Sequence, residues 1–240
     1  MRINKYIAHQ GWASRREADT LIEKGLVLVN GKGATIGQKI KEGDKVELTG
    51  NTKEKKYFAY YKGRGIITHS PNITKGEKDI MMQLKKARPE LDLSDVSPIG
   101  RLDKDSEGLI ILSNDGRITA ALLDPDNGHE KEYDVILDKN VTNMLIKSIE
   151  NGINIEGYTT KPAKAIKHPR NPRRLTIILT EGKKHQIRRM CAAKGYQVQS
   201  LKRTRIINIE LGKLKPNQLR KIQGAELLEF LKTLDIQHRK

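Results

Sequence analysis

Short apolar runs at irregular intervals constrain the fold of this chain more than any other feature of its sequence. Strand-like runs such as 109–112, 131–137 and 175–180 are interspersed with short helical patterns. No run approaches the roughly 18 apolar residues of a membrane span. There is no internal repeat and no regular alternation of strand and helix, which disfavours a doubly wound parallel sheet. We predict an α+β protein whose larger domain has a mixed, mainly antiparallel sheet flanked by helices.

The first 48 residues form a pattern of their own. Ser14 and Glu17 have the spacing of a capping box and predict the start of a helix, and Gly25 predicts its end. Strand-like residues 26–29 lead into Asn30-Gly31, which is a strong hairpin-turn signal. The polar residues 49–56 then read as a linker. We therefore predict a small domain at 1–48 and a larger one at 57–240.

Most of the positive charge lies in one segment. Residues 161–205 contain 14 lysines and arginines and one acid, which accounts for 13 of the 17 net positive charges of the chain. Because the segment includes the strand-like run 175–180, these charges sit on folded structure rather than on a solvated tail. Clustered like charges destabilise a fold unless a partner neutralises them. A nucleic-acid partner is therefore favoured over a merely soluble basic surface.

Residue types that hold cofactors or metals show no matching pattern. Cys191 is the single cysteine, which excludes an intramolecular disulfide and a thiolate-rich zinc site, and the six histidines are scattered. No dinucleotide loop, Walker motif or nucleophile elbow occurs. The amino terminus has no apolar signal segment. We expect a cytoplasmic protein with no metal, cofactor or membrane partner.

The sequence GRLDKDSEGL at 100–109 places a carboxylate-rich turn directly before a buried strand. A partly desolvated Asp103 would stay ionised only with a cation nearby, which the basic segment could supply. Asp103 and Asp105 face opposite ways in an extended chain, so a paired-carboxylate site is not indicated. Spacing alone favours an ordinary turn with solvated acids.

This turn resembles the signature of the RNA pseudouridine synthases of the RsuA/RluB/RluF type. Lys131-Glu132-Tyr133 resembles the second motif of that family, and EGKKHQIRRM at 181–190 resembles the third. The first 48 residues are similar to an S4 RNA-binding domain through SRREAD at 14–19 and VNG at 29–31. The matches follow the family's order, span nearly the whole chain and are closest to the RluF branch, which acts on large-subunit ribosomal RNA.

The resemblance implies that the chain isomerises a specific uridine of ribosomal RNA to pseudouridine without a cofactor. The glycosidic C–N bond breaks, the base rotates, and C5 rejoins the sugar. The essential aspartate of the family falls on Asp103, which would act as a nucleophile or take a proton in a glycal route. The family's basic partner falls on Arg188, which would hold Asp103 ionised and oriented. The family's tyrosine falls on Tyr133, which can stack on an extruded uracil.

Further residues are expected to contact RNA. Arg101 would fill the space left by the flipped nucleotide or bind its phosphate. The other predicted contacts are basic and lie in the first domain or the third motif: Arg15, Arg16, Lys183, Lys184 and Arg189. One departure from the family is YKGRG at 61–65, where Asn-Lys-Pro-x-Gly is usual, and loss of the proline loosens that turn.

Two alternatives stay open at the level of sequence. One is the same reaction on small-subunit ribosomal RNA or tRNA, because RNA targets are set by loop shape and single-stranded context. The other is a non-catalytic, ribosome-associated RNA-binding protein. The presence of Asp103, Tyr133 and Arg188 together favours the enzyme. We expect it to be a monomer.

Overall fold

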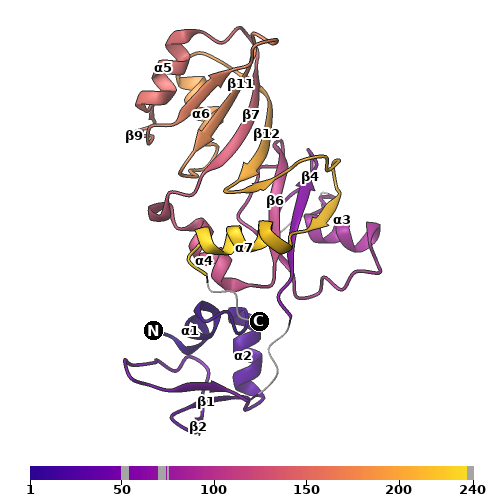
Figure 1. Cartoon of the computed structure of the whole chain (residues 1–240), viewed down its shortest axis with the longest axis vertical. Helices are drawn as coiled ribbons and strands as arrows, with labels where there is room; N and C mark the ends of the chain where they lie inside the picture. The colour runs from indigo at the N-terminus through magenta and orange to yellow at the C-terminus, as the bar shows by residue number, and fades with distance from the viewer. Residues whose placement is uncertain (50–53, 70–73, 75, 237–240) are drawn as a thin grey trace.

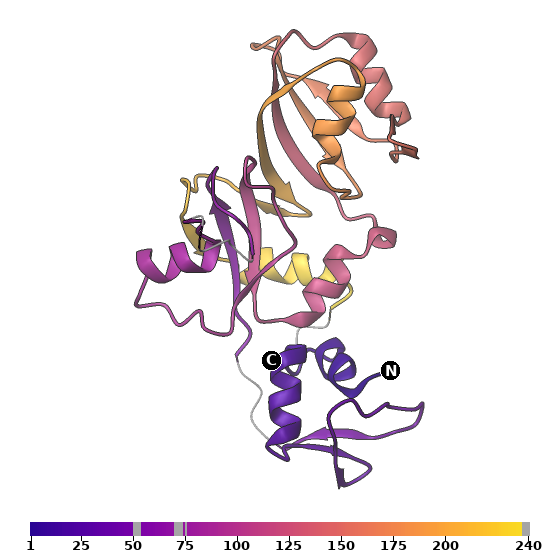
Figure 2. The same cartoon turned by 180° about the vertical axis from the view of Figure 1, so that it is seen from behind.

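The computed structural model describes residues 1–49, 54–69, 74 and 76–236. An N-terminal unit lies at one end of an elongated molecule, and β4, β6, α3, α4 and α7 lie in the middle (Figure 1). The strands β7, β11 and β12, with α5 and α6, form the other end, as the view from behind also shows (Figure 2). Residues 50–53 of the predicted linker lie outside the described residues.

The N-terminal unit pairs two helices with a small antiparallel sheet. Its elements are α1 (Ile3–His9), α2 (Arg15–Glu23), β1 (Val27–Val29), β2 (Lys32–Gly33) and β3 (Val46–Leu48), with strand order β2-β1-β3. The predicted capping box is confirmed, because the Glu17 amide donates to Ser14 Oγ at 3.2 Å and the Ser14 amide donates to Glu17 Oε2 at 3.0 Å. Ile3, Ile7 and Val27 belong to a hydrophobic cluster confined to this unit.

A large mixed sheet forms the rest of the fold. In the described residues its strands are β4 (Tyr57–Lys62), β5 (Ser97–Ile99), β6 (Glu107–Ser113), β7 (Lys131–Leu137), β10 (Lys164–Lys167), β11 (Arg174–Leu179), β12 (Val198–Ile206), β13 (Ile209–Glu210) and β14 (Leu219–Lys221). The order is β10-β11-β7-β12-β6-β4-β14, with β13 on β12 and β5 on β6. Among these described strands only β12 and β6 pair in parallel, so the predicted α+β class with a mainly antiparallel sheet is confirmed.

Alternate residues of the central strands point to opposite sides of this sheet. Both faces carry apolar side chains, and helices cover both. One face packs against α3 (Ile80–Ala87), α5 (Asn143–Asn151) and α6 (Gln186–Ala193). The other packs against α4 (Gly116–Leu123) and α7 (Gly224–Thr233). The remaining elements are the short helix η2 (Pro125–Asn127) and the hairpin of β8 (Asn154–Ile155) and β9 (Tyr158–Thr159). No helix in the described parts of the chain is long and apolar enough to cross a membrane.

The N-terminal unit rests on the larger one through α1 and α4. Gly11 has a φ of +70°, and a Cβ there would lie 2.3 Å from Nε of Arg117. Arg117 is itself held by Asp115, with Nη2 to Oδ2 at 2.8 Å. Gly11 is therefore required both by its backbone conformation and by the close approach of the arginine.

Candidate active site

A cavity of about 780 Å³ opens where the loop before β6, strands β7 and β12, and the start of α6 meet. Five of the predicted site residues line it: Arg101, Asp103, Tyr133, Lys183 and Lys184. They come from three segments that are far apart in the sequence and that the sheet brings together. The cavity therefore combines a carboxylate, an aromatic ring and a basic rim.

Thr68 fixes the main chain immediately before Asp103. Its hydroxyl donates to the carbonyl of Leu102 at 2.9 Å and accepts from the amide of Leu102 at 3.1 Å. Thr68 is 3% exposed, so water does not compete for these two bonds. The carboxylate of Asp103 thus follows a residue, Leu102, whose amide and carbonyl are both held by Thr68.

Lys62 holds the same loop from beneath. Its side chain is fully buried, and Nζ donates to the carbonyls of Gly63 at 3.1 Å, Lys104 at 3.5 Å and Ser106 at 2.7 Å. Burial lowers the pKa of Lys62 to about 8, while the negative charges of Asp103 and its acidic neighbours act in the opposite direction. The loop therefore closes around a buried ammonium group.

Asp103 is paired with a histidine rather than with the expected arginine. Nε2 of His185 lies 3.3 Å from Oδ1 of Asp103, and the two side chains are 48% and 38% exposed. Arg188 instead donates to the carbonyls of Val198 at 3.1 Å and Asp105 at 3.2 Å, and it does not line the cavity. Its guanidinium is thus already bound to main-chain oxygens. In the described residues Arg188 supports the loop two residues beyond the carboxylate, and the expected Asp103–Arg188 pair stays a prediction.

Tyr133 presents its ring to the cavity from β7. It is 9% exposed and packs in the hydrophobic cluster on that face of the sheet. Its hydroxyl makes no hydrogen bond to any residue that the structure describes. The ring is therefore fixed by packing, and its hydroxyl is available to a bound molecule.

Comparison with known proteins identifies the family to which this chain belongs. Residues 56–193 match the RNA pseudouridylate synthase family, and residues 1–46 match the S4 domain. This chain belongs to the RNA pseudouridine synthase family. The predicted family resemblance and the predicted S4 domain are both confirmed, and the synthase is therefore an enzyme that forms pseudouridine in RNA.

Individual relatives support the assignment over nearly the whole chain. The synthase is 39% identical over 241 residues to the dual-specificity RNA pseudouridine synthase RluF of Escherichia coli, covering 98% of this chain and 80% of that one. It is 36% identical over 234 residues to the ribosomal large subunit pseudouridine synthase B of Bacillus subtilis, covering 94% and 93%. A crystal structure of a pseudouridylate synthase superposes with a TM-score of 0.69 at 26% identity, covering 98% and 99%.

The other predicted RNA contacts of the synthase lie in different settings. Arg101 is exposed at the cavity rim, and Nζ of Lys183 lies 4.7 Å from the centre of the Tyr158 ring. Arg189 is away from the cavity, because its guanidinium donates to the Ile155 carbonyl and to Glu156 Oε2 at 2.7 Å. A phosphate contact of Arg189, as predicted, would therefore compete with its ion pair to Glu156.

Arg15 and Arg16 occupy the first turn of α2 and are exposed. No ion pair involves either of them within the described ranges. Both residues are exposed at a helix amino terminus, which is a favourable place for a phosphate. They stay candidates for contact with RNA outside the cavity.

Sequence reasoning missed several residues of the site: Lys62, Thr68, Lys131, His185 and Arg203. Lys62 falls in the YKGRG segment, and His185 falls in the third motif, so both carried a motif signal that was not assigned a role. Thr68 carried no local signal, because it contacts Leu102 from a loop that is distant in the sequence. Arg203 carried none, because its position opposite Tyr133 depends on the sheet register. Among the described residues, no group of three histidine, cysteine or acidic side chains is placed to hold a metal ion.

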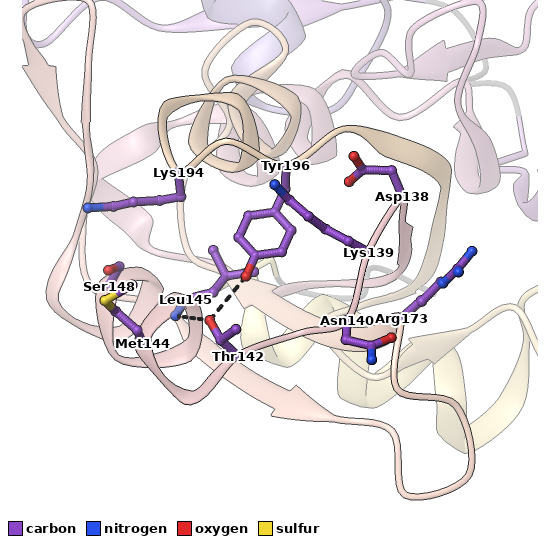
Figure 3. Close-up of a pocket in the computed structure, with 10 residues that line it drawn as sticks. All are labelled: Asp138, Lys139, Asn140, Thr142, Met144, Leu145, Ser148, Arg173, Lys194 and Tyr196. Atoms are coloured by element: carbon purple, nitrogen blue, oxygen red, sulfur yellow. Dashed lines mark hydrogen bonds between the residues drawn. The ribbon is translucent and has the colours of Figure 1, made fainter.

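A second cavity, of about 630 Å³, lies at the far end of α6. Figure 3 shows Tyr196 and Thr142 at its centre, with a hydrogen bond of 3.0 Å between their hydroxyl groups. Lys139, Arg173 and Lys194 give it a basic lining, but none of the predicted site residues lies there. This cavity is therefore separate from the candidate active site.

Proposed function

We propose that the synthase converts a uridine of large-subunit ribosomal RNA to pseudouridine, with Asp103 as the catalytic carboxylate. The observation that carries the proposal is the position of Asp103 and Tyr133 in one cavity whose rim is basic. The ribosomal large subunit named for the Bacillus subtilis relative supports this RNA class. We also propose that the synthase acts in the cytoplasm, where it would meet a ribosomal RNA substrate, and that it acts as a monomer.

The target uridine must leave its stack before Asp103 can reach its sugar. Extrusion opposes binding by about a few kcal/mol. Arg101, Lys183 and Lys184 at the rim are placed to bind the flanking phosphates and offset this, and the Tyr133 ring offers a surface on which the uracil stacks. The cavity walls then hold the nucleotide with its glycosidic bond near the carboxylate.

Bond breakage uses the Asp103 carboxylate in one of two ways. An oxygen bonds to C1′ of the ribose, or it takes the C2′ proton as a glycal forms. In both routes the electron pair of the C1′–N1 bond leaves with the base. After the base rotates, C5 bonds to C1′ as the bond between Asp103 and C1′ breaks or, in the glycal route, as the carboxyl group returns its proton to C2′. The C5 proton is then lost, and N1 gains a proton. His185 is placed to orient the carboxylate, and Thr68 and Lys62 hold its main chain.

The N-terminal unit has a separate role in this proposal. We propose that residues 1–48 bind RNA outside the cavity through Arg15 and Arg16, that 49–56 link the parts, and that 57–240 contain the whole catalytic apparatus. The separate hydrophobic cluster of the N-terminal unit supports this division.

Mapping of pseudouridines tests the proposal. Ribosomal RNA is compared between cells with the gene, cells without it, and cells carrying Asp103→Asn. One uridine of the large-subunit RNA should be modified only with the wild-type protein. Asp103→Asn protein should bind that RNA within a few-fold of wild type, because the amide keeps the shape of the carboxylate. Normal modification by purified Asp103→Asn protein would contradict the role of Asp103.

A second candidate is activity on more than one RNA. It is favoured by the dual specificity named for the Escherichia coli relative. Mapping small-subunit ribosomal RNA and tRNA from the same cells tests it directly, since a second site lost with the gene would extend the substrate range beyond the large subunit.

A further inference from the structure

Arg203 occupies a crowded position beneath the cavity. In the sheet it lies opposite Tyr133 of β7 and beside Gly108 of β6. Gly108 has a φ of +110°, and a Cβ there would lie 2.2 Å from the carbonyl oxygen of Arg203. Arg203 is 5% exposed, and Nε donates to the carbonyl of Leu109 at 2.7 Å. Like Asp103 and Tyr133, Arg203 lines the cavity.

Two buried polar atoms on this wall have no partner within the described part of the protein. They are Nη2 of Arg203 and Oγ of Ser106, and both residues line the cavity. Ser106 is 1% exposed. A buried donor left without an acceptor is unfavourable, more so when the donor is charged, and an unpaired group in a native protein calls for a ligand or a water. The wall is thus equipped to meet a hydrogen-bond acceptor.

Buried cations on this wall and beneath it make no ion pair in the described residues. Burial, with the nearby charge of Arg203, lowers the pKa of Lys131 to about 8, and burial does the same to Lys62. Lys131 Nζ donates to the carbonyl of His129 at 3.0 Å. No carboxylate of the described chain lies within ion-pair distance of Lys62, Lys131 or Arg203. The wall therefore suits a group that gains negative charge.

The uracil base is that group in the reaction. When the C1′–N1 bond breaks, the departing base takes the electron pair and its carbonyl oxygens share the negative charge. Fixed donors aimed at an oxygen that gains charge stabilise the transition state more than the ground state. A phosphate stays on the backbone, outside the cavity, whereas the base enters beside Tyr133 and reaches the wall that Arg203 forms.

We propose that Arg203, assisted by Ser106, donates a hydrogen bond to a carbonyl oxygen of the extruded uracil and stabilises the base as its bond to C1′ breaks. The electron pair of that bond passes to the base and is returned when C5 bonds to C1′. Arg203 is then a catalytic residue in addition to Asp103. This inference rests on the proposed function, since it needs a uracil in the cavity.

Sulfur substitution of the substrate tests the hydrogen bond directly. The probe is a short RNA that carries the mapped target uridine as uridine, 2-thiouridine or 4-thiouridine, because sulfur is a poorer acceptor than oxygen. Single-turnover rates at saturating RNA are measured for wild type, Arg203→Lys and Ser106→Ala. With wild type, one of the two thio substitutions should slow turnover about ten- to a hundredfold, as for loss of a charge-assisted hydrogen bond. With Arg203→Lys, the same sulfur should slow turnover less than about threefold.

A matched control lies two residues along the same strand. Arg205 forms ion pairs with Glu130 and Glu132 and does not line the cavity. Arg205→Lys should keep the full sulfur penalty. Ser106→Ala removes one hydroxyl group and should reduce the penalty part-way, so the proposal stays testable if Arg203→Lys fails to fold.

The outcomes separate the two proposals. Equal sulfur penalties in wild type and Arg203→Lys, or no penalty in wild type, would overturn the hydrogen bond and leave a buried water as the partner of Nη2. Absence of pseudouridine in the ordinary RNA with wild-type protein would instead overturn the proposed substrate.

Discussion

Replacing Thr68 by valine tests whether the main chain at Leu102 must be fixed for catalysis. The change removes two buried hydrogen bonds, of 2.9 and 3.1 Å, and leaves one carbonyl and one amide unpaired. At about 1–3 kcal/mol for each buried group, stability should fall by about 2–6 kcal/mol. For a chain of this size that lowers Tm by roughly 4–24 °C. If about 2 kcal/mol of this lost free energy normally holds Asp103 in its reacting position, the rate of the chemical step falls about 30-fold.

The assay is release of tritium from C5 of the target uridine, because C5 loses its hydrogen when the carbon–carbon bond forms. Rates are measured in a single turnover at saturating RNA, where binding differences do not contribute. Thr119→Val is the matched control: Thr119 lines the same cavity, is exposed, and makes no side-chain hydrogen bond in the described ranges. It should stay within about twofold of wild type. A Thr68→Val protein with a lowered Tm and the wild-type rate would refute the reasoning.

Three further outcomes are expected. The ammonium of Lys62 is charged below its pKa of about 8 and neutral above it, so the single-turnover rate should fall as pH rises through 8. Lys62→Arg, which stays charged, should remove this fall in rate at high pH. If the fall remains in Lys62→Arg but disappears in Lys131→Arg, the titrating group is Lys131. In a salt titration, log affinity should fall with a slope of about −3 to −4 against log salt if about five phosphates are bound, and a slope near zero would contradict binding along the backbone. A chain beginning at Glu54 should fold and bind RNA about ten- to several-hundredfold more weakly. Its single-turnover rate at saturating RNA should be close to that of the full chain; normal affinity with a collapsed rate would show that the N-terminal unit positions the uridine.

Local signals predicted the elements that depend on local interactions. The Ser14 cap, the turn at Asn30-Gly31 and the strand 131–137 are all found where they were expected. Helix α3 begins at Ile80, where Asp79 caps it by accepting from the amide of Met82. Strand β12 was not predicted. Its sequence has several charged residues and few apolar ones, so it lacks a clear strand pattern. It forms a strand because β7 and β6 both pair with it.

The sequence predicted those residues of the site that lie in the recognised motifs and come together in the fold. Asp103 and Tyr133 line one cavity because the strands carrying their motifs are both joined to β12. The contact between His185 and Asp103 was not predicted, because Arg188 and His185 lie three residues apart at the start of α6 and the sequence does not show which side chain lies beside the carboxylate. Arg203 could not be assigned from sequence, because its role depends on the register that sets it beside Tyr133.

The strand order of the large sheet also has a consequence for biosynthesis. β6 is flanked by β4, which is made early, and by β12, which is made late, and β4 takes its outer neighbour from β14 at 219–221. Pairings between such distant segments form slowly, whereas the hydrophobic cluster of the N-terminal unit draws only on its first 48 residues. During translation the N-terminal unit therefore folds first. Each nascent synthase passes through an interval in which its RNA-binding unit is complete while the cavity still lacks the wall that Arg203 provides.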